Sequence, residues 1–600
     1  MITRPGSYCS LPLLLITLSC VGSALTETAT AAEKPRPTKV RYAEFILDEA
    51  LPESPGGGGL FGELSIDLRK LITRFDQAAE DKKIAGMLLR LESPPLGRGQ
   101  VAELRAAIKR FRASGKQVVA QLDMATGPAY QLACACDEIV MPESGYLTLT
   151  GVRAEPFFYK GMLSKLGVKA DFIHMGEAKG AAEPYTRREW SEPVKANMTA
   201  LVNDLYEQMI ETIALERPVT EARVRELVDI GLITATKAKE AGLIDRVAYP
   251  EELRASLKES NEADRFVYVR NYGKEGVDTD FSGPTGFLKL MQLMAGGGGG
   301  KGRSKASKIA VVYAVGAIHT GESEDSALGE SSLGSTTLIE ALAEADRDKD
   351  VAAIVLRIDS PGGSALASDL MWSRIQQIEK PVVASMGDTA ASGGYYLAMG
   401  CDKIFAEPGT ITGSIGVVGG KMAIAGLLDK VGVTTDSVSR GRNSGLFSLI
   451  ERFSDSEREA ITAMMEETYE QFTSKAAEGR GLEHARVKEL AGGKVYTGRQ
   501  AKQLRLVDEI GALADAVAEA KQLAGLDADA KVEIKTLPEP VDLFESLFGS
   551  GDPQREVRLS IGLQTVSPEL SELARRATLL QKLLRREPVL MLSPVAVSIE

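Results

Sequence analysis

A serine within a run of small residues is the strongest candidate for chemistry in this sequence of 600 residues. Ser392 follows an apolar run that begins at Val383, and it precedes Gly393 and Gly394. It therefore falls where a strand is expected to give way to a helix, and a bare hydroxyl there would be flanked by free backbone N–H groups. The pattern favours a displayed nucleophile, although a tight packing turn between a strand and a helix would use the same small residues.

Several stretches of the chain recur at a spacing of about 265 residues, which is the signature of a repeated structural unit. Residues 84–94 read like residues 351–361, and Cys136–Ile139 has a counterpart in Cys401–Ile404. Short runs rich in Val, Ile and Leu, such as 309–314, alternate with helical patterns in each copy, which indicates parallel β-α units. The sequence thus predicts two tandem domains of the α/β class.

Further elements are expected from local signals in the second copy. Residues 353–358 and 381–384 are apolar and rich in β-branched side chains, so we expect strands there. The sequence Ser454–Glu457 is a capping box that would open a long helix, and Ser191 before Glu192-Pro193 would start its counterpart in the first copy.

The two copies differ where chemistry would need them to be alike. The second copy has Asp-Ser-Pro-Gly-Gly at 359–363, whereas the first has Glu-Ser-Pro-Pro-Leu at 92–96. Two glycines let the backbone turn N–H groups toward a ligand, but Pro95 has no N–H. The first copy also lacks the candidate serine, yet it has Lys179 where the second copy has Ser444. A lysine whose pKa is lowered by burial can take the proton of a serine, so one site assembled from both copies would explain the split.

Composition narrows the class of function. With 44% hydrophobic and 26% charged residues the chain is an ordinary globular protein, and its length exceeds what one core usually supports. A net charge of −12 argues against a nucleic-acid partner, because no basic excess would displace counterions from phosphates. Cys134, Cys136 and Cys401 are too few for a disulfide framework and have no further ligands nearby for a metal site, so we expect them to pack as small apolar residues. No metal or cofactor is expected.

The ends and the middle of the chain suggest its division. Residues 11–25 form an apolar run with a proline inside, too short to span a membrane comfortably, and small residues follow it. The glycine-rich run at 295–304 has the composition of a flexible linker. The expected parts are a signal peptide or short N-terminal anchor (1–31), a first repeat that carries the lysine (37–285), a linker (286–306), a second repeat that carries the serine (307–525) and a C-terminal extension (526–600).

These motifs together resemble those of the signal peptide peptidase A family in its long, two-repeat form, whose members are Ser-Lys proteases of the ClpP/crotonase superfamily. The similarity covers nearly all of residues 40 to 525, and its most specific parts are the sequences at 359–363, 391–395 and 412–416, with Lys179 and Glu183-Pro184. The resemblance implies two tandem ClpP/crotonase-like domains. Its site residues would be the nucleophile Ser392, the general base Lys179, a serine that orients the lysine, Ser414, and two oxyanion N–H donors, Gly363 and Gly393.

The resemblance also implies a biological setting. Its substrates would be hydrophobic peptides such as cleaved signal peptides, degraded without a cofactor on the periplasmic side of the inner membrane. The expected assembly is a membrane-associated homotetramer.

Three other interpretations compete with this one. A crotonase-type acyl-CoA hydratase or hydrolase would also hold an oxyanion with backbone N–H groups, but it would not need Lys179 and Ser392 in complementary copies. A non-catalytic scaffold that binds hydrophobic peptides would be expected to have lost one of these residues. In a Ser-His-Asp peptidase, His174 or His319 would serve as the base, although the chain has only three histidines.

Overall fold

The computed structural model describes most of both expected repeats. The described residues are 38–55, 66–270, 272–273, 307–323, 332–539 and 589–592. The expected leader at 1–31, the expected linker at 286–306 and residues 540–588 and 593–600 of the expected extension lie outside them.

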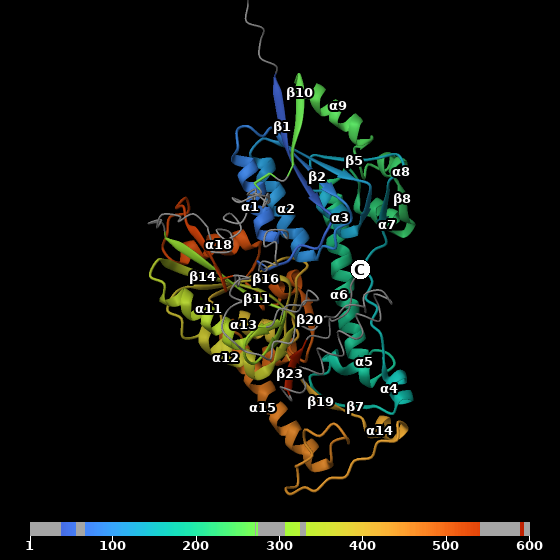
Figure 1. The fold of residues 1–600 in the computed structure, drawn as a ribbon, viewed down its shortest axis with the longest axis vertical. Helices are drawn as coiled ribbons and strands as arrows, with labels where there is room; N and C mark the ends of the chain where they lie inside the picture. The colour runs from blue at the N-terminus through green and yellow to red at the C-terminus, as the bar shows by residue number, and fades with distance from the viewer. Residues whose placement is uncertain are drawn as a thin grey trace, which may run out of the picture.

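Each repeat is built on a mostly parallel sheet flanked by helices, as the sequence predicts (Figure 1). The sheet of the first repeat has the order β10-β1-β2-β3-β5-β9. Its strands are β1 (Lys39–Leu47), β2 (Gly86–Leu91), β3 (Gln117–Leu122), β5 (Glu138–Met141), β9 (Arg246–Val247) and β10 (Arg265–Arg270), and β4 (Met124–Thr126), β6 (Tyr146–Leu149) and β8 (Gly231–Thr234) form a small separate sheet. The continuous apolar runs of the central strands are buried on both faces, which is typical of a parallel sheet covered by helices.

The sheet of the second repeat has the order β20-β18-β16-β14-β11-β22, with β17 and β21 beside β16. Its strands are β11 (Lys308–Val315), β14 (Val351–Ser360), β16 (Val382–Ala391), β17 (Lys403–Ala406), β18 (Ile411–Gly413), β20 (Val495–Thr497), β21 (Glu509–Ile510) and β22 (Glu533–Leu537). The strands expected at 309–314, 353–358 and 381–384 are confirmed as β11, β14 and β16. The second strand of the expected extension, β22, joins this sheet beside β11, so the region after residue 525 completes the second repeat.

The helices follow the expected β-α alternation. They are α1 (Leu68–Glu80), α2 (Arg98–Ala113), α3 (Gly127–Ala133), α4 (Lys160–Leu166), η1 (Gly180–Ala182), α5 (Glu183–Thr186), α6 (Glu192–Glu216), α7 (Glu221–Ile230), α8 (Ala235–Glu240), α9 (Pro250–Ser260), α11 (Ser335–Arg347), α12 (Ala365–Ile375), α13 (Gly393–Ala398), α14 (Ala425–Lys430), α15 (Asp455–Arg480), α16 (His484–Leu490), α17 (Gly498–Gln503) and α18 (Leu513–Leu523). The capping box of Ser454 and Glu457 opens α15, and Ser191 is the N-cap of α6, as predicted. Cys134, Cys136 and Cys401 are buried, as the packing interpretation requires.

A third sheet joins the two repeats. Its order is β13-β12-β15-β23-β19-β7, from the strands β7 (Lys169–Met175), β12 (Ala317–His319), β13 (Ser332–Gly334), β15 (Gly362–Ser364), β19 (Val417–Ala423) and β23 (Val589–Leu592). Here β7 belongs to the first repeat and β19 to the second, and they pair antiparallel over their whole length. In Figure 1 the segment from α4 to α6 reaches down from the first repeat and lies against β19 and β20 of the second.

A buried ion cluster also holds the repeats together. Arg357 on β14 is 1% exposed, and its Nε lies 2.5 Å from Glu53 Oε1. Its Nη1 lies 2.8 Å from Glu103 Oε1 and donates to Ser385 Oγ at 2.8 Å. Both carboxylates come from the first repeat, so the arginine of the second repeat neutralises two buried charges across the contact. Such a cluster contributes little net stability when intact, but removal of one partner leaves uncompensated charge in the interior.

We therefore expect Arg357→Met to lower the free energy of the first unfolding transition in urea by about 3–5 kcal/mol. The matched control is Arg223→Met, because Arg223 pairs with Glu226 on the surface, with both side chains at least half exposed. That change should cost no more than about 1 kcal/mol. Equal losses for the two variants would contradict the role assigned to Arg357.

Candidate active site

Ser392 occupies the junction between β16 and α13, where the sequence predicts it. It is the N-cap of α13 with φ 57° and ψ −112°, a strained conformation for a residue with a side chain. Its N–H donates to Gly413 O at 2.8 Å, which fixes the turn. The expectation of a bare hydroxyl is wrong for this state, since Ser392 is 0% exposed. The residues that cover it are Lys179 and strands of the third sheet.

Lys179 reaches Ser392 from the other repeat. It follows β7 and lies at the start of η1, and it is 1% exposed. Its Nζ lies 2.7 Å from Ser392 Oγ, 3.0 Å from Ser414 Oγ and 2.8 Å from the main-chain oxygen of Ser414. The structure thus brings together the three side chains that the sequence comparison and the resemblance singled out, and it takes both from a single chain.

Two glycines that the sequence analysis missed make this approach possible. A Cβ at Gly493 would lie 2.5 Å from the Cα of Lys179, and the main-chain oxygen of Gly492 accepts the N–H of Ala178 at 2.8 Å. The corresponding positions in the first repeat are Asp229 and Ile230, 263 residues earlier. This contrast between the copies was a usable signal, and it belongs with the glycines of the 359–363 loop.

The electrostatics at Lys179 favour the neutral amine. Burial holds the pKa of the Lys179 amine well below the ordinary value for lysine. A neutral amine has two N–H donors and one lone pair, and the three contacts of Nζ match this inventory. The N–H groups can donate to the two oxygens of Ser414 while the lone pair accepts the O–H of Ser392. In that protonation state the lysine is poised to take a proton from the serine.

The expected donor loop lies beside the serine. Gly362 and Gly363 form β15 next to the start of α13, and a Cβ at Gly393 would lie 3.2 Å from the N atom of Gly363. The space around this loop is closed, because a Cβ at Gly363 would lie 2.0 Å from Ile318 O. The N–H groups of Gly363 and Gly393 therefore lie close together at the position predicted for an oxyanion hole.

The strand that presents Ser392 also contacts the first repeat. In the ladder between β14 and β16, Ile358 pairs with Met386 but Ser360 pairs with Ala390, so β16 bulges between these points. Within the bulge, Asp388 accepts the N–H of Gly99 at 2.6 Å, where α2 begins, and a negative charge at a helix N-terminus is favourable. Burial raises the pKa of Asp388, which shows how closely the two repeats meet there.

The histidines considered as alternative bases have other partners. His174 is exposed, and its Nδ1 lies 2.9 Å from Gly176 O. His319 is buried, with Nδ1 2.8 Å from Thr320 O and Nε2 3.0 Å from Ser332 Oγ. The base that lies within hydrogen-bond distance of Ser392 Oγ is Lys179.

The fold and the comparisons with known proteins place the chain among the serine proteases. The sequence model of the family described as Peptidase family S49 matches it twice, over residues 110–264 and 374–527. The chain therefore belongs to peptidase family S49, and the two matches confirm the tandem arrangement of similar α/β domains.

Relatives with printed activities support the same assignment. The chain is 33% identical over 490 residues to the chloroplastic serine protease SPPA of Arabidopsis thaliana, which covers 81% of this chain and 70% of that protein. It is 31% identical over 482 residues to Protease 4 of Haemophilus influenzae, with 77% and 74% covered. Protease 4 of Salmonella typhi is 29% identical over 487 residues, with 78% and 75% covered.

Within the described ranges, no helix combines the length and the apolar character needed to cross a membrane.

The buried lysine should make the stability of the protein depend on pH in a defined direction. Between its lowered folded pKa and the ordinary lysine value of about 10.4, Lys179 binds a proton only in the unfolded chain, so stability rises with pH in this window. Lys179→Met removes this contribution. We expect the unfolding free energy of the wild type to gain on that of the variant as pH rises from 7 to 10, by at most about 1.4 kcal/mol per pH unit.

Urea unfolding at several pH values measures this difference. Lys82→Met, at an exposed lysine after α1, is the control and should follow the wild type at every pH. A difference between wild type and Lys179→Met that stays constant or shrinks with pH would show that the folded lysine is charged.

Proposed function

We propose that this chain is a serine endopeptidase whose catalytic dyad is Ser392 and Lys179. The observation that carries the proposal is the 2.7 Å contact between Lys179 Nζ and Ser392 Oγ in an interior that favours the neutral amine. The neutral lysine takes the serine proton as Oγ attacks a peptide carbonyl, and it then passes this proton to the leaving nitrogen. Water next enters, is activated by the same amine, and hydrolyses the acyl-enzyme.

The remaining site residues have supporting roles in this scheme. The N–H groups of Gly363 and Gly393 stabilise the oxyanion, and one such donor is typically worth about 2.7–4 kcal/mol of barrier. Ser414 holds the amine in line with Ser392 through its hydroxyl and its main-chain oxygen. Ser414 itself has φ 55°, and its N–H donates to Lys494 O at 2.7 Å, so its position is fixed by the backbone.

The proposed substrates are hydrophobic peptides such as released signal peptides. A substrate would bind as an extended strand between β15 and β19, where main-chain pairing supplies affinity and side-chain pockets supply specificity. The apolar strand β23 lies in this position, with Val589, Leu590 and Met591 buried. A groove that fits these side chains supports apolar substrates.

The setting of the enzyme is also part of the proposal. The apolar run within residues 1–31 supports export, and we place the activity on the periplasmic side of the inner membrane, in association with it. The proposed parts of the chain are repeats at 37–285 and 307–525, with a linker at 286–306 and an extension at 526–600. The proposed assembly is a homotetramer.

The dyad is tested by Ser392→Ala and Lys179→Ala, assayed with a fluorogenic apolar leader peptide. Each change removes one member of a unit, so each should lower kcat/KM by about a thousandfold or more while circular dichroism stays unchanged. Lys380→Ala is the matched control, since Lys380 is a half-buried lysine that donates to Ala345 O and Asp348 O far from Ser392. Near wild-type turnover by Lys179→Ala would refute the dyad.

A further inference from the structure

The tail of the chain lies in the groove proposed for substrate. Strand β23 pairs antiparallel with β15 on one side, with Met591 opposite Gly363 and Leu590 opposite Ser364. On its other side it pairs antiparallel with β19, with Leu590 opposite Val418. A short strand held on both edges in this way satisfies its backbone as a bound peptide would.

The carbonyl of Met591 lies at the expected oxyanion hole. A Cβ built on Gly362 would lie 2.0 Å from Met591 O and 2.6 Å from the N atom of Gly393, so these two atoms converge on one point. The register places the same residue opposite Gly363, the other proposed donor. A substrate carbonyl about to be attacked by Ser392 would occupy this place.

The side chains of β23 alternate between the two repeats. Val589 and Met591 pack into the core of the second repeat. Leu590 packs with Ala182 and Val418, close to the segment that carries Lys179. The pockets on both sides of the groove are therefore filled by residues of the chain itself.

We propose that the Met591–Leu592 peptide bond is a self-processing site, an inference that rests on the proposed peptidase function. Ser392 Oγ adds to the carbonyl carbon of Met591, and the bond to the Leu592 nitrogen breaks. The leaving amine takes the proton that Lys179 removed from the serine. Water hydrolyses the ester to a Met591 carboxylate, regenerates Ser392, and residues 592–600 are released.

Intact mass spectrometry of the full chain tests this site. The Ser392→Ala chain, which cannot process itself, is incubated with wild type, and its C-terminus is followed with time. We expect the wild type to end at Met591, and the Ser392→Ala chain either to be trimmed in trans or to keep residue 600 if cleavage occurs only within one chain. Met591→Asp in an otherwise wild-type chain places a charge in the apolar groove and should slow trimming at least tenfold, whereas Met464→Asp, at a half-exposed methionine of α15, should not.

Parallel hydrolysis of an apolar test peptide separates the possible failures. A wild type that cleaves the peptide but keeps residue 600 overturns the self-processing site and leaves the peptidase function standing. A wild type that does neither refutes the peptidase function. Trimming at another bond, or trimming by a separately purified Ser392→Ala chain, overturns the assignment to Met591 and Ser392.

A second and independent observation concerns the contact between the repeats. At the junction within the chain, β7 pairs with β19, and Asp171 of β7 is buried. Its carboxylate lies 2.5 Å from Arg458 and accepts the N–H of Phe453 at 3.0 Å. Gly167 packs closely as well, since a Cβ there would lie 2.5 Å from the main chain of Gly426.

The counterparts of these donor residues are exposed. Residues 136–172 align with 401–437 without a gap, so Asp171 corresponds to Asp436 and Gly167 to Gly432. Residues 431–440 are all exposed, and a Cβ at Gly432 would have nothing within 4 Å. The second repeat therefore has a β7-like segment without a partner strand in the described chain.

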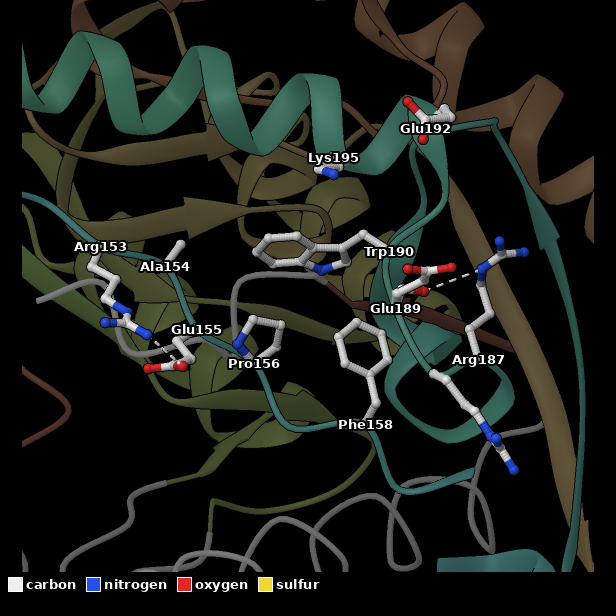
Figure 2. Close-up of a pocket in the computed structure, with 11 residues that line it drawn as sticks. Arg153, Ala154, Glu155, Pro156, Phe158, Arg187, Glu189, Trp190, Glu192 and Lys195 are labelled. Carbon is white, nitrogen blue, oxygen red and sulfur yellow. Dashed lines mark hydrogen bonds and ion pairs between the residues drawn. The ribbon is translucent and has the colours of Figure 1, made fainter. Parts of the chain in front are cut away.

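The counterparts of the receptor residues line a cavity of about 380 Å³ in the first repeat (Figure 2). The segment that corresponds to β19 has a single bridge residue, Ala154, and no strand. Trp190 and Lys195 stand where Phe453 and Arg458 hold Asp171, and the rings of Trp190 and Phe158 meet edge to face at 6.4 Å. Arg187 and Arg188 add further positive charge to the lining.

We infer that residues 434–440 of one copy pair antiparallel with 152–158 of a second copy, and that Asp436 enters this cavity beside Lys195. The facing sizes are complementary, because Gly420 faces Phe172 within the chain, whereas Glu155 would face Ser437. Pro156 has no N–H, so side-chain contacts must carry the pairing at that position. The contact is head to tail, and it closes into a ring where the rotation between copies allows.

Charge reversal and light scattering test this junction. Asp436→Lys and Lys195→Asp should each shift the wild-type oligomer to monomer, because each places like charges together. A mixture of the two variants should reassemble, since every contact then joins opposite charges. Asp527→Lys makes the same charge change at an exposed site and should keep the wild-type mass.

Mass is the readout, so the result does not depend on peptidase activity. A monomeric wild type, an unchanged mass for Asp436→Lys, or a mixture that stays monomeric would each overturn the junction. Cysteines at Ala154 and Val438 should cross-link copies into a ladder, whereas cysteines at Ala154 and Thr434, out of register, should not. Equal cross-linking of both pairs would overturn the register.

Discussion

The site depends on one contact, the burial of a lysine amine from the first repeat against a serine hydroxyl of the second. An ammonium group in that interior would be strongly disfavoured, so the fold selects the form of Lys179 that can accept a proton. The same burial requires the first repeat to extend α4, β7 and α6 over its neighbour, and it requires glycines where the two main chains meet. The interface between repeats and the chemistry are therefore one construction.

The geometry of the serine adds a second constraint. Ser392 is held at a positive φ by the bond from its N–H to Gly413 O, and the strand that leads to it is tied to α2 through Asp388. The donor loop follows β14, whose Arg357 neutralises carboxylates of the first repeat. Both strands that shape the site thus contact the other repeat within a few residues of the reacting groups.

Much of this arrangement could be predicted from the sequence, because duplication makes differences between the copies informative. Ser392 and Lys179 stood out as residues present in one copy and absent from the other, and β11, β14 and β16 followed from apolar runs. The role of Gly492 and Gly493 is steric, and it emerges only when the main chain of Lys179 is placed against them. Strand β23 has four residues and lies about 50 residues after β22, so no periodicity marks it, and its pairing explains why Ser392 is covered rather than bare.

The presence of serine at 444, where the first repeat has Lys179, bears on how such a chain can change over generations. Each half retains requirements that the other has shed, so substitutions in the 92–96 loop are released from selection for chemistry, whereas those in the 359–363 loop are not. Recombination that replaced one half by a copy of the other would leave either two bases or two nucleophiles. Selection therefore keeps the halves unlike, even though their fold is the same.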